Sequence, residues 1–269
     1  MEVYKEHLEK AVIAAKQAGN LVLEMIPKNH QLNTEERLLL MDEADRKVHD
    51  SIYDTLCNDF LEYEYISVYT ENQIFYKNKP LWVIDPIVGL GNFSHGDPHF
   101  AVSIALMING VTVVALIYNP IFNELFTAIK EQGAFLNEKQ IHVSKTKKLE
   151  HALLSTRFPY DIRNSKVTNL NLFNNLIMKS EGVLNNATAT LDLAYVASGQ
   201  YDGFWALQMN PWDLVAATLL IQEAGGKVST LSGEYYFTES TEILATNANI
   251  HEEIIEVISK VPRESKEYN

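Results

Sequence analysis

The sequence predicts a layered α/β fold, in which helices and sheets pack face to face. The first part of the chain combines two helical patterns with an antiparallel run of strands, and the second part alternates strands with helices. A helix and a sheet each bury one apolar face, so a chain that has both kinds of element packs in layers. With 269 residues, 46% of them hydrophobic, the chain can bury a large core.

The N-terminal segment predicts two helices and two short strands. Residues 3–25 carry apolar side chains every three or four positions, and Pro27 with the polar stretch after it ends this helix. A second helix is expected to begin near Asp42 and to run to about residue 60. The apolar runs at 65–69 and 81–85 are typical of strands.

The middle of the chain predicts antiparallel strands. The dipeptide Asn109-Gly110 separates the β-rich runs FAVSIALMI and VTVVALIYNP, which indicates a hairpin with a tight turn. Two more strands are expected on either side of Gly133.

The last part of the chain alternates between strand and helix patterns. Asn249 and Glu252 resemble a capping box at the start of the final helix. Strands are expected at 152–156, 182–186, 201–205 and 243–246, and helices at 167–179, 191–198 and 211–224.

Composition limits the domain organisation and the partners. No repeat, low-complexity tract or linker interrupts the chain, so we expect a single domain over residues 1–269 with a soft internal boundary near 145–150. The net charge of −13 and the pI near 5.0 disfavour a direct nucleic-acid partner. Cys57 is the only cysteine, which excludes a disulfide framework. The charged start and the lack of any run of roughly 20 apolar residues predict a cytoplasmic protein with no membrane partner.

Three carboxylates stand at the ends of predicted elements. Asp85 ends the apolar run LWVID and precedes the loop PIVGLGNF, and strand ends of this kind hold ligands in α/β sheets. Asp213 falls in a first helical turn, where Asn210 can cap and Pro211 can take the first position. Glu71 follows the strand-like ISVY. Each carboxylate taken singly also has an ordinary structural explanation, as a turn residue, a partner of the helix dipole or an exposed side chain.

Taken together, these segments resemble the inositol monophosphatase family. The segment WVIDPIVGLGNFSHGDPHFAVSIAL resembles the family's strand, loop and helix that hold metal. The family's second signature is also present: the region from Leu191 to Gly226 resembles it, with LDLAYVASGQYDGFW followed by NPWDLVAATLLIQEAGG. YTEN contains Glu71, and DEADRKV contains Asp45, at the family's metal and catalytic positions. The likeness runs in order along nearly the whole chain and implies an alternating α-β-α-β-α sandwich.

The resemblance also implies a hydrolase that contains magnesium. Family members hydrolyse phosphate monoesters of inositol or related polyols with two or three Mg²⁺ ions, which prefer oxygen ligands. The implied ligands are Glu71, Asp85, the Ile87 carbonyl and Asp213, with Asp85 between two ions. The small partner would be a phosphorylated polyol or sugar, and the assembly a homodimer.

Further positions follow from the same resemblance. Asp45 and Glu71 would be catalytic. Backbone N–H groups at a helix start would bind the phosphate. The resemblance places this phosphate cradle at Gly89, Leu90 and Gly91, and the substrate pocket at Ala187, Thr188 and Ala206.

The sequence departs from the family pattern at residues whose side chains bind metal or orient water in the family. Val88 stands where the family has an aspartate that binds metal, and Leu90 stands where it has a threonine that orients water. Neither apolar side chain can coordinate a metal or form a hydrogen bond. We therefore expect the protein to bind at least one Mg²⁺ ion and to have one of two alternative functions. One is a Mg²⁺-dependent phosphomonoesterase with impaired turnover; the other is a catalytically inactive paralogue that binds a phosphate ligand or a protein partner.

Overall fold

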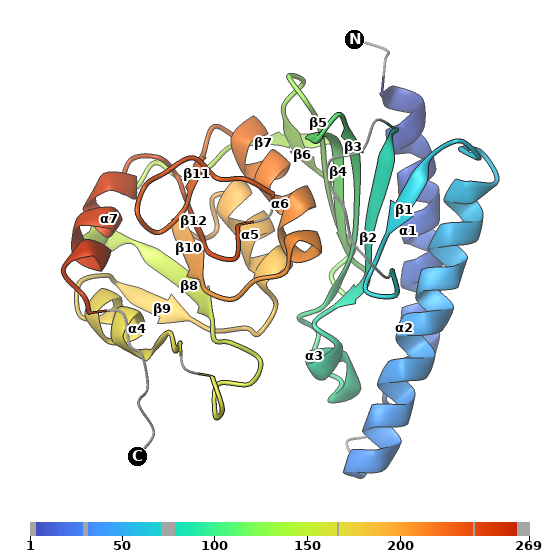
Figure 1. The fold of residues 1–269 in the computed structure, drawn as a ribbon, viewed down its shortest axis with the longest axis horizontal. Helices are drawn as coiled ribbons and strands as arrows, with labels where there is room; N and C mark the ends of the chain where they lie inside the picture. The colour runs from blue at the N-terminus through green and yellow to red at the C-terminus, as the bar shows by residue number, and fades with distance from the viewer. Residues whose placement is uncertain (1–3, 29–31, 71–78, 166, 239, 263–269) are drawn as a thin grey trace.

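The fold consists of five alternating layers of helices and sheets (Figure 1). The computed structural model describes residues 4–28, 32–70, 79–165, 167–238 and 240–262. Within these residues the strands form two sheets, one of seven strands and one of five. This architecture confirms the α-β-α-β-α sandwich predicted from the sequence.

The first sheet contains the strands of the N-terminal half. Strand β1 pairs with β2 in parallel, and all later neighbours are antiparallel. The bounds are β1 Glu64–Ile66, β2 Leu81–Val88, β3 Ala101–Ile108, β4 Val111–Asn119, β5 Glu124–Ile129, β6 Ala134–Leu136 and β7 Lys139–Ile141. Asn109 (φ 52°) and Gly110 (φ 76°) connect β3 to β4 in the left-handed region that a tight hairpin turn needs, which confirms the predicted hairpin.

The second sheet has the strand order β11-β12-β10-β8-β9. Strands β8 and β10 are parallel, so their carboxyl ends meet at the same edge. The bounds are β8 Leu153–Arg157, β9 Gly182–Leu184, β10 Gly203–Ala206, β11 Lys227–Ser229 and β12 Ile243–Thr246. The chain passes from one sheet to the other between Ile141 and Leu153, and the expectation of a single domain stays a prediction.

Helices form the outer and central layers (Figure 1). The pair α1 and α2 covers one face of the first sheet, α5 and α6 lie between the sheets, and α4 with α7 covers the far face of the second. The bounds are α1 Lys5–Met25, α2 Thr34–Cys57, α3 Leu90–Ser94, α4 Leu170–Ile177, α5 Ala189–Ala197, α6 Pro211–Glu223 and α7 His251–Ser259. No helix in the described ranges is long and apolar enough to cross a bilayer.

The alternation of side chains along the strands separates two large cores. On the first sheet, Trp82 and Ile104 face α1 and α2, whereas Ile117 and Phe126 face α5 and α6. Helices α5 and α6 are buried almost all round because they contact a sheet on each side. The central layer therefore joins the two halves of the chain through one continuous core.

Two helix starts differ from the prediction. Helix α2 begins at Thr34 and not near Asp42, because Asn33 and Glu36 form a complete capping box: Asn33 Oδ1 accepts from the Glu36 N–H at 3.0 Å, and the Asn33 N–H donates to Glu36 Oε2 at 2.8 Å. Asn249 does not cap the last helix. Instead Asn247 Oδ1 accepts from the backbone N–H of Asn249, at 3.1 Å, and of Ile250, at 3.3 Å. Strands β7 and β11 were also not predicted.

A fully buried histidine connects α7 to the second sheet. His251 Nε2 lies 2.8 Å from Ser229 Oγ, and Nδ1 lies 2.9 Å from Thr246 Oγ1. Ser229 Oγ donates to the Thr230 carbonyl, and Thr246 Oγ1 accepts from the Ala248 N–H. The proton of the neutral ring therefore lies on Nε2. Burial, and next the positive charge of Lys227, lower the pKa of His251 to about 4.

Candidate active site

A cleft of about 430 Å³ opens where the two halves of the chain meet. Its walls come from the end of β2, the short helix α3, the end of β8 and the start of α6. The lining residues are Val68, Asp85, Ile87, Val88, Gly89, Leu90, Gly91, Asn92, Arg157, Phe158, Pro159, Tyr160, Asn185, Ala187, Ala189, Asn210, Trp212 and Asp213.

A β-bulge places Asp85 at the floor of the cleft. The pairing of β2 with β3 shifts register between Asp85 and Val88, and Pro86 within this interval has no N–H to donate. A bulge re-aims the side chains beside it, so the last residues of a buried strand can reach a ligand. Asp85 is only 7% exposed.

Gly89 makes the turn from β2 into α3. Its φ of +88° lies in the left-handed region, and a Cβ at this position would lie 2.9 Å from Thr188 Oγ1 and 3.0 Å from the His99 carbonyl oxygen. Thr188 Oγ1 donates to that same carbonyl at 2.6 Å. Asn92 Nδ2 donates to it as well, and to the Asn186 carbonyl, both at 2.7 Å. These bonds hold the loop before α5 against α3 and the loop that follows α3.

Asp213 enters the cleft from the first turn of α6. Asn210 is the N-cap residue and Pro211 takes the first helical position, as the sequence predicts, although the Asn210 side chain makes no capping hydrogen bond to the helix backbone. Thr190 Oγ1 on α5 donates to the Asp213 carbonyl at 2.6 Å and fixes the turn. The Asp213 carboxylate faces Arg157, whose Nη1 lies 3.4 Å from Oδ2.

The carboxyl groups of Asp85 and Asp213 lie close enough for each to shift the pKa of the other. Burial, followed by the negative charges of Asp213 and Asp45, raises the pKa of Asp85 well above its usual value. Burial also raises the pKa of Asp213, against the opposing effect of Arg157. Two buried carboxyl groups in contact cannot both ionise without a compensating cation, so this pair is suited to a hard divalent ion.

Asp45 lies behind the cleft and does not line it. The Tyr69 hydroxyl donates to Asp45 Oδ2 at 2.6 Å, and the Ile87 N–H also donates to this carboxyl group. Burial raises the pKa of Asp45, although both hydrogen bonds act in the opposite direction. Asp42, one turn earlier on α2, is exposed and pairs with Arg46 at 3.2 Å, so it does not contribute to the site.

Few acidic side chains that could hold a metal ion are gathered in the described part of the cleft. Glu71 lies outside the described residues, and among those described no three His, Cys, Asp or Glu side chains are gathered closely enough to hold a metal ion. The carboxylates of Asp85 and Asp213 and the backbone at Ile87 supply the oxygen atoms that Mg²⁺ prefers. Beside Asp213, positive charge already comes from Arg157.

The predicted phosphate and substrate residues divide into two groups. Gly89, Leu90, Gly91 and Ala187 line the cleft. Thr188 and Ala206 do not, because Thr188 is buried between two loops and Ala206 is fully buried in β10.

Arg157, Tyr160 and Trp212 also line the cleft, although the sequence analysis did not predict them as site residues. Trp212 is partly exposed and lines the same cleft. Arg157 had a detectable signal, because it ends a strand in a part of the chain where strands and helices alternate. The carboxyl ends of such strands lie where ligands bind.

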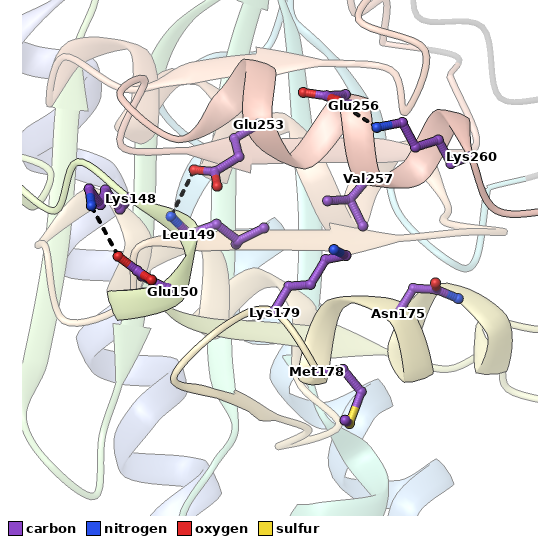
Figure 2. A pocket seen from close by; sticks show the side chains of 10 residues that line it. All are labelled: Lys148, Leu149, Glu150, Asn175, Met178, Lys179, Glu253, Glu256, Val257 and Lys260. Carbon is purple, nitrogen blue, oxygen red and sulfur yellow. Dashed lines mark hydrogen bonds and ion pairs between the residues drawn. The ribbon is translucent and has the colours of Figure 1, made fainter.

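A second cavity of about 770 Å³ lies between α4, α7 and the short 3₁₀ helix Leu149–His151 (Figure 2). Three lysines and three glutamates line it, and Figure 2 shows that several of them pair along its rim. Lys148 pairs with Glu150 at 3.2 Å, and Lys260 pairs with Glu256 at 2.5 Å. Because these charges balance, the cavity has no excess of either sign to select a charged ligand.

Comparison with known proteins identifies close relatives over almost the whole chain. The sequence model described as "Inositol monophosphatase family" matches residues 4–263. The chain is 37% identical to the Nus factor SuhB of Pseudomonas aeruginosa, covering 93% of this chain and 95% of that protein. It is 36% identical to the inositol monophosphatase of Dictyostelium discoideum, covering 96% of each. The solved structure of the inositol monophosphatase of Anabaena (Nostoc) sp. superposes with a TM-score of 0.86 at 33% identity, covering 96% of this chain and 97% of that one.

Proposed function

Because this chain belongs to the inositol monophosphatase family, we propose that it is a Mg²⁺-dependent phosphomonoesterase of inositol or sugar phosphates with impaired turnover. The observation that supports this proposal best is the buried pair of Asp85 and Asp213, contributed by the two halves of the chain to one cleft. In this proposal Asp85, Asp213, the Ile87 carbonyl and Glu71 would supply the ligands for at least one Mg²⁺ ion. Bound there, Mg²⁺ would polarise a phosphate oxygen and lower the pKa of a coordinated water.

The protein's own groups would bind and orient the phosphate. Gly89, Leu90 and Gly91 line the cleft, and Gly89 has a left-handed φ, so in this proposal their backbone N–H groups would bind the phosphate. Asp85 and Asp213 would fix the cation opposite this cradle. Ala187 lines the cleft next to the cradle, where the polyol or sugar would lie.

Two apolar side chains account for the impaired turnover in this proposal. Val88 and Leu90 both line the cleft, yet neither offers an oxygen atom. Asp45, the expected catalytic carboxylate, is buried behind Ile87 and bonded to Tyr69. Without a hydroxyl at residue 90, no side chain at that position can pass a proton from an attacking water toward Asp45.

A phosphatase assay with restored groups tests this proposal. Inositol 1-phosphate is offered to the purified protein with Mg²⁺ and with a chelator, in wild-type, Val88→Asp/Leu90→Thr and Asp85→Asn forms. We expect slow hydrolysis by the wild type, an increase of about tenfold or more in the double variant, and none with Asp85→Asn or the chelator. Wild-type activity that survives both Asp85→Asn and chelation would contradict the assignment of the site.

The relatives named Nus factor SuhB favour a second candidate, in which the chain is a catalytically inactive paralogue that acts through a protein partner. Phosphatase activity absent from the wild type, from the double variant and from every substrate offered would favour this candidate. We also propose a cytoplasmic homodimer, which light scattering of the purified protein would test as a molecular mass near twice the 30.5 kDa of one chain.

A further inference from the structure

Arg157 brings a guanidinium group into the cleft from the end of β8. Its Nη1 lies 3.4 Å from Asp213 Oδ2 and 3.6 Å from Met209 Sδ, and its Cζ lies 5.8 Å from the centre of the Tyr160 ring. The side chain is 20% exposed, so the group is largely removed from water but still faces the cleft. A charge in this position interacts strongly with any anion that enters.

A buried cluster of polar groups fixes the backbone of Arg157. Asn169 Nδ2 donates to the Arg157 carbonyl at 3.0 Å and to Thr156 Oγ1 at 2.6 Å. Asn169 Oδ1 accepts from Trp205 Nε1 at 2.6 Å, and Thr156 Oγ1 donates to the Trp205 carbonyl at 2.7 Å. The Arg157 backbone also aligns with Ala206 in the parallel pairing of β8 with β10. The guanidinium therefore extends from a rigid support, which favours a binding role over a solvated surface charge.

The contacts of the guanidinium leave most of its donors available. The 3.4 Å distance to Asp213 exceeds the roughly 2.7–2.9 Å of a strong charged hydrogen bond, and a thioether is a weak acceptor. Within the described part of the chain, both contacts use Nη1. The Nη2 and Nε donors can therefore form the forked pair of bonds with which arginine binds phosphate.

The charges of the other lining side chains also favour a role for the positive charge of Arg157 in binding an anion. A phosphate monoester anion that enters the cleft meets the acidic side chains of Asp85 and Asp213, which supply no positive charge to it. Val88 and Leu90 supply neither charge nor donor from their side chains. Among the described lining residues, Arg157 is the one with a positive charge.

We propose that Arg157 binds the phosphate group of the ligand from the Asp213 side of the cleft, so that a single divalent cation at Asp85 completes the site. Arg157 thereby specifies an anionic phosphate ester over the neutral polyol. This inference rests on the proposed function, because it takes the same cleft as the phosphate site.

Calorimetric titration tests this role without any turnover. Inorganic phosphate is titrated into the wild type, Arg157→Gln, Arg157→Lys and Arg163→Gln in saturating Mg²⁺, and MgCl₂ is titrated separately into each. Arg163→Gln is the matched control, since it removes the same charge from an exposed position in the loop that follows β8, outside the lining of the cleft. We expect Arg157→Gln to weaken phosphate binding about 10- to 100-fold, Arg157→Lys to weaken it less, and Arg163→Gln to leave it unchanged.

The Mg²⁺ titration separates a binding role from general damage to the cleft. Removal of the positive charge beside Asp213 should tighten Mg²⁺ binding in Arg157→Gln while phosphate binding weakens. Weaker binding of both ions would overturn the inference, since it would show a structural role for Arg157. Unchanged phosphate binding in Arg157→Gln would overturn it too, but would leave the proposed function standing. No phosphate binding to the wild type would overturn both proposals together.

Discussion

Replacement of Asn169 by alanine should destabilise the protein more than any exposed substitution on α4. Asn169 is fully buried, and its orientation is unambiguous: its Nδ2 faces the Arg157 carbonyl, which can only accept, and its Oδ1 faces Trp205 Nε1–H, which can only donate. Asn169→Ala leaves the indole N–H without its acceptor inside a closed core. A buried donor left unpaired costs about 1–3 kcal/mol.

Loss of the two Nδ2 donors adds to this cost. Thr156 Oγ1 keeps its bond to the Trp205 carbonyl, so the added loss is moderate, and we expect a total of about 2–4 kcal/mol for Asn169→Ala. Each kcal/mol corresponds to about 2–4 °C in a protein of this size, so Tm should fall by roughly 5–15 °C.

Thermal and urea unfolding, followed by circular dichroism, measure this effect against a matched control. Asn175 lies on α4, which Asn169 precedes as the N-cap residue, and the exposed Asn175 side chain donates to the Asn171 carbonyl at 2.8 Å. Asn175→Ala should change the free energy of unfolding by less than about 0.5 kcal/mol, because alanine has the higher helix propensity. Equal destabilisation by the two substitutions would refute the reasoning.

A double-mutant cycle isolates the indole contact. Trp205→Phe removes the N–H, so Asn169→Ala should cost about 1–2 kcal/mol less in that background than in the wild type. Simple additivity of the two changes would show that Trp205 and Asn169 are not energetically coupled.

Two further predictions concern stability. Burial lowers the pKa of His251 to about 4 from its usual 6.5. Between these two pH values the unfolded chain binds a proton at His251 and the folded chain does not. His251 therefore contributes stability above pH 6.5, and this stability is lost as the pH falls toward 4. Urea titrations at pH 7 and 4.5 should therefore show that the wild type loses roughly 2 kcal/mol more than His251→Gln over this interval; parallel losses would contradict the assignment. Gly226→Ala should cost about 1–3 kcal/mol, since its Cβ would lie 2.7 Å from the Thr246 carbonyl oxygen, whereas Gly91→Ala, with no atom within 4 Å, should be nearly neutral in the same unfolding assay.

Local signals in the sequence predicted most of the fold. The turn at Asn109-Gly110 and the alternation of strand and helix from residue 152 onward act over a few residues, and each formed as predicted. The prediction for the start of α2 was wrong although its signal is also local, because the cap at Asn33 lies in the polar stretch that follows Pro27. The short strand β11 owes its structure to pairing with β12 and has no pattern of its own.

The sequence predicted a residue of the site where its position on a single helix or strand was enough to indicate a role. Asp85 at a strand end and Asp213 in a first helical turn both line the cleft. Arg157 was not predicted, because its role depends on Asp213, which lies 56 positions later in the chain and on another element. For Ala206 the resemblance supplied a pocket position, but the register of β10 buries the residue.

The central layer has a consequence for synthesis on the ribosome. The first sheet is complete at Ile141, but the helices that cover its inner face are complete only at Glu223, about 80 residues later. At a synthesis rate of about 5–20 residues per second, the apolar face that contains Ile117 and Phe126 stays uncovered for roughly 4–16 seconds. During this interval the nascent chain exposes a surface to which a ribosome-associated chaperone can bind.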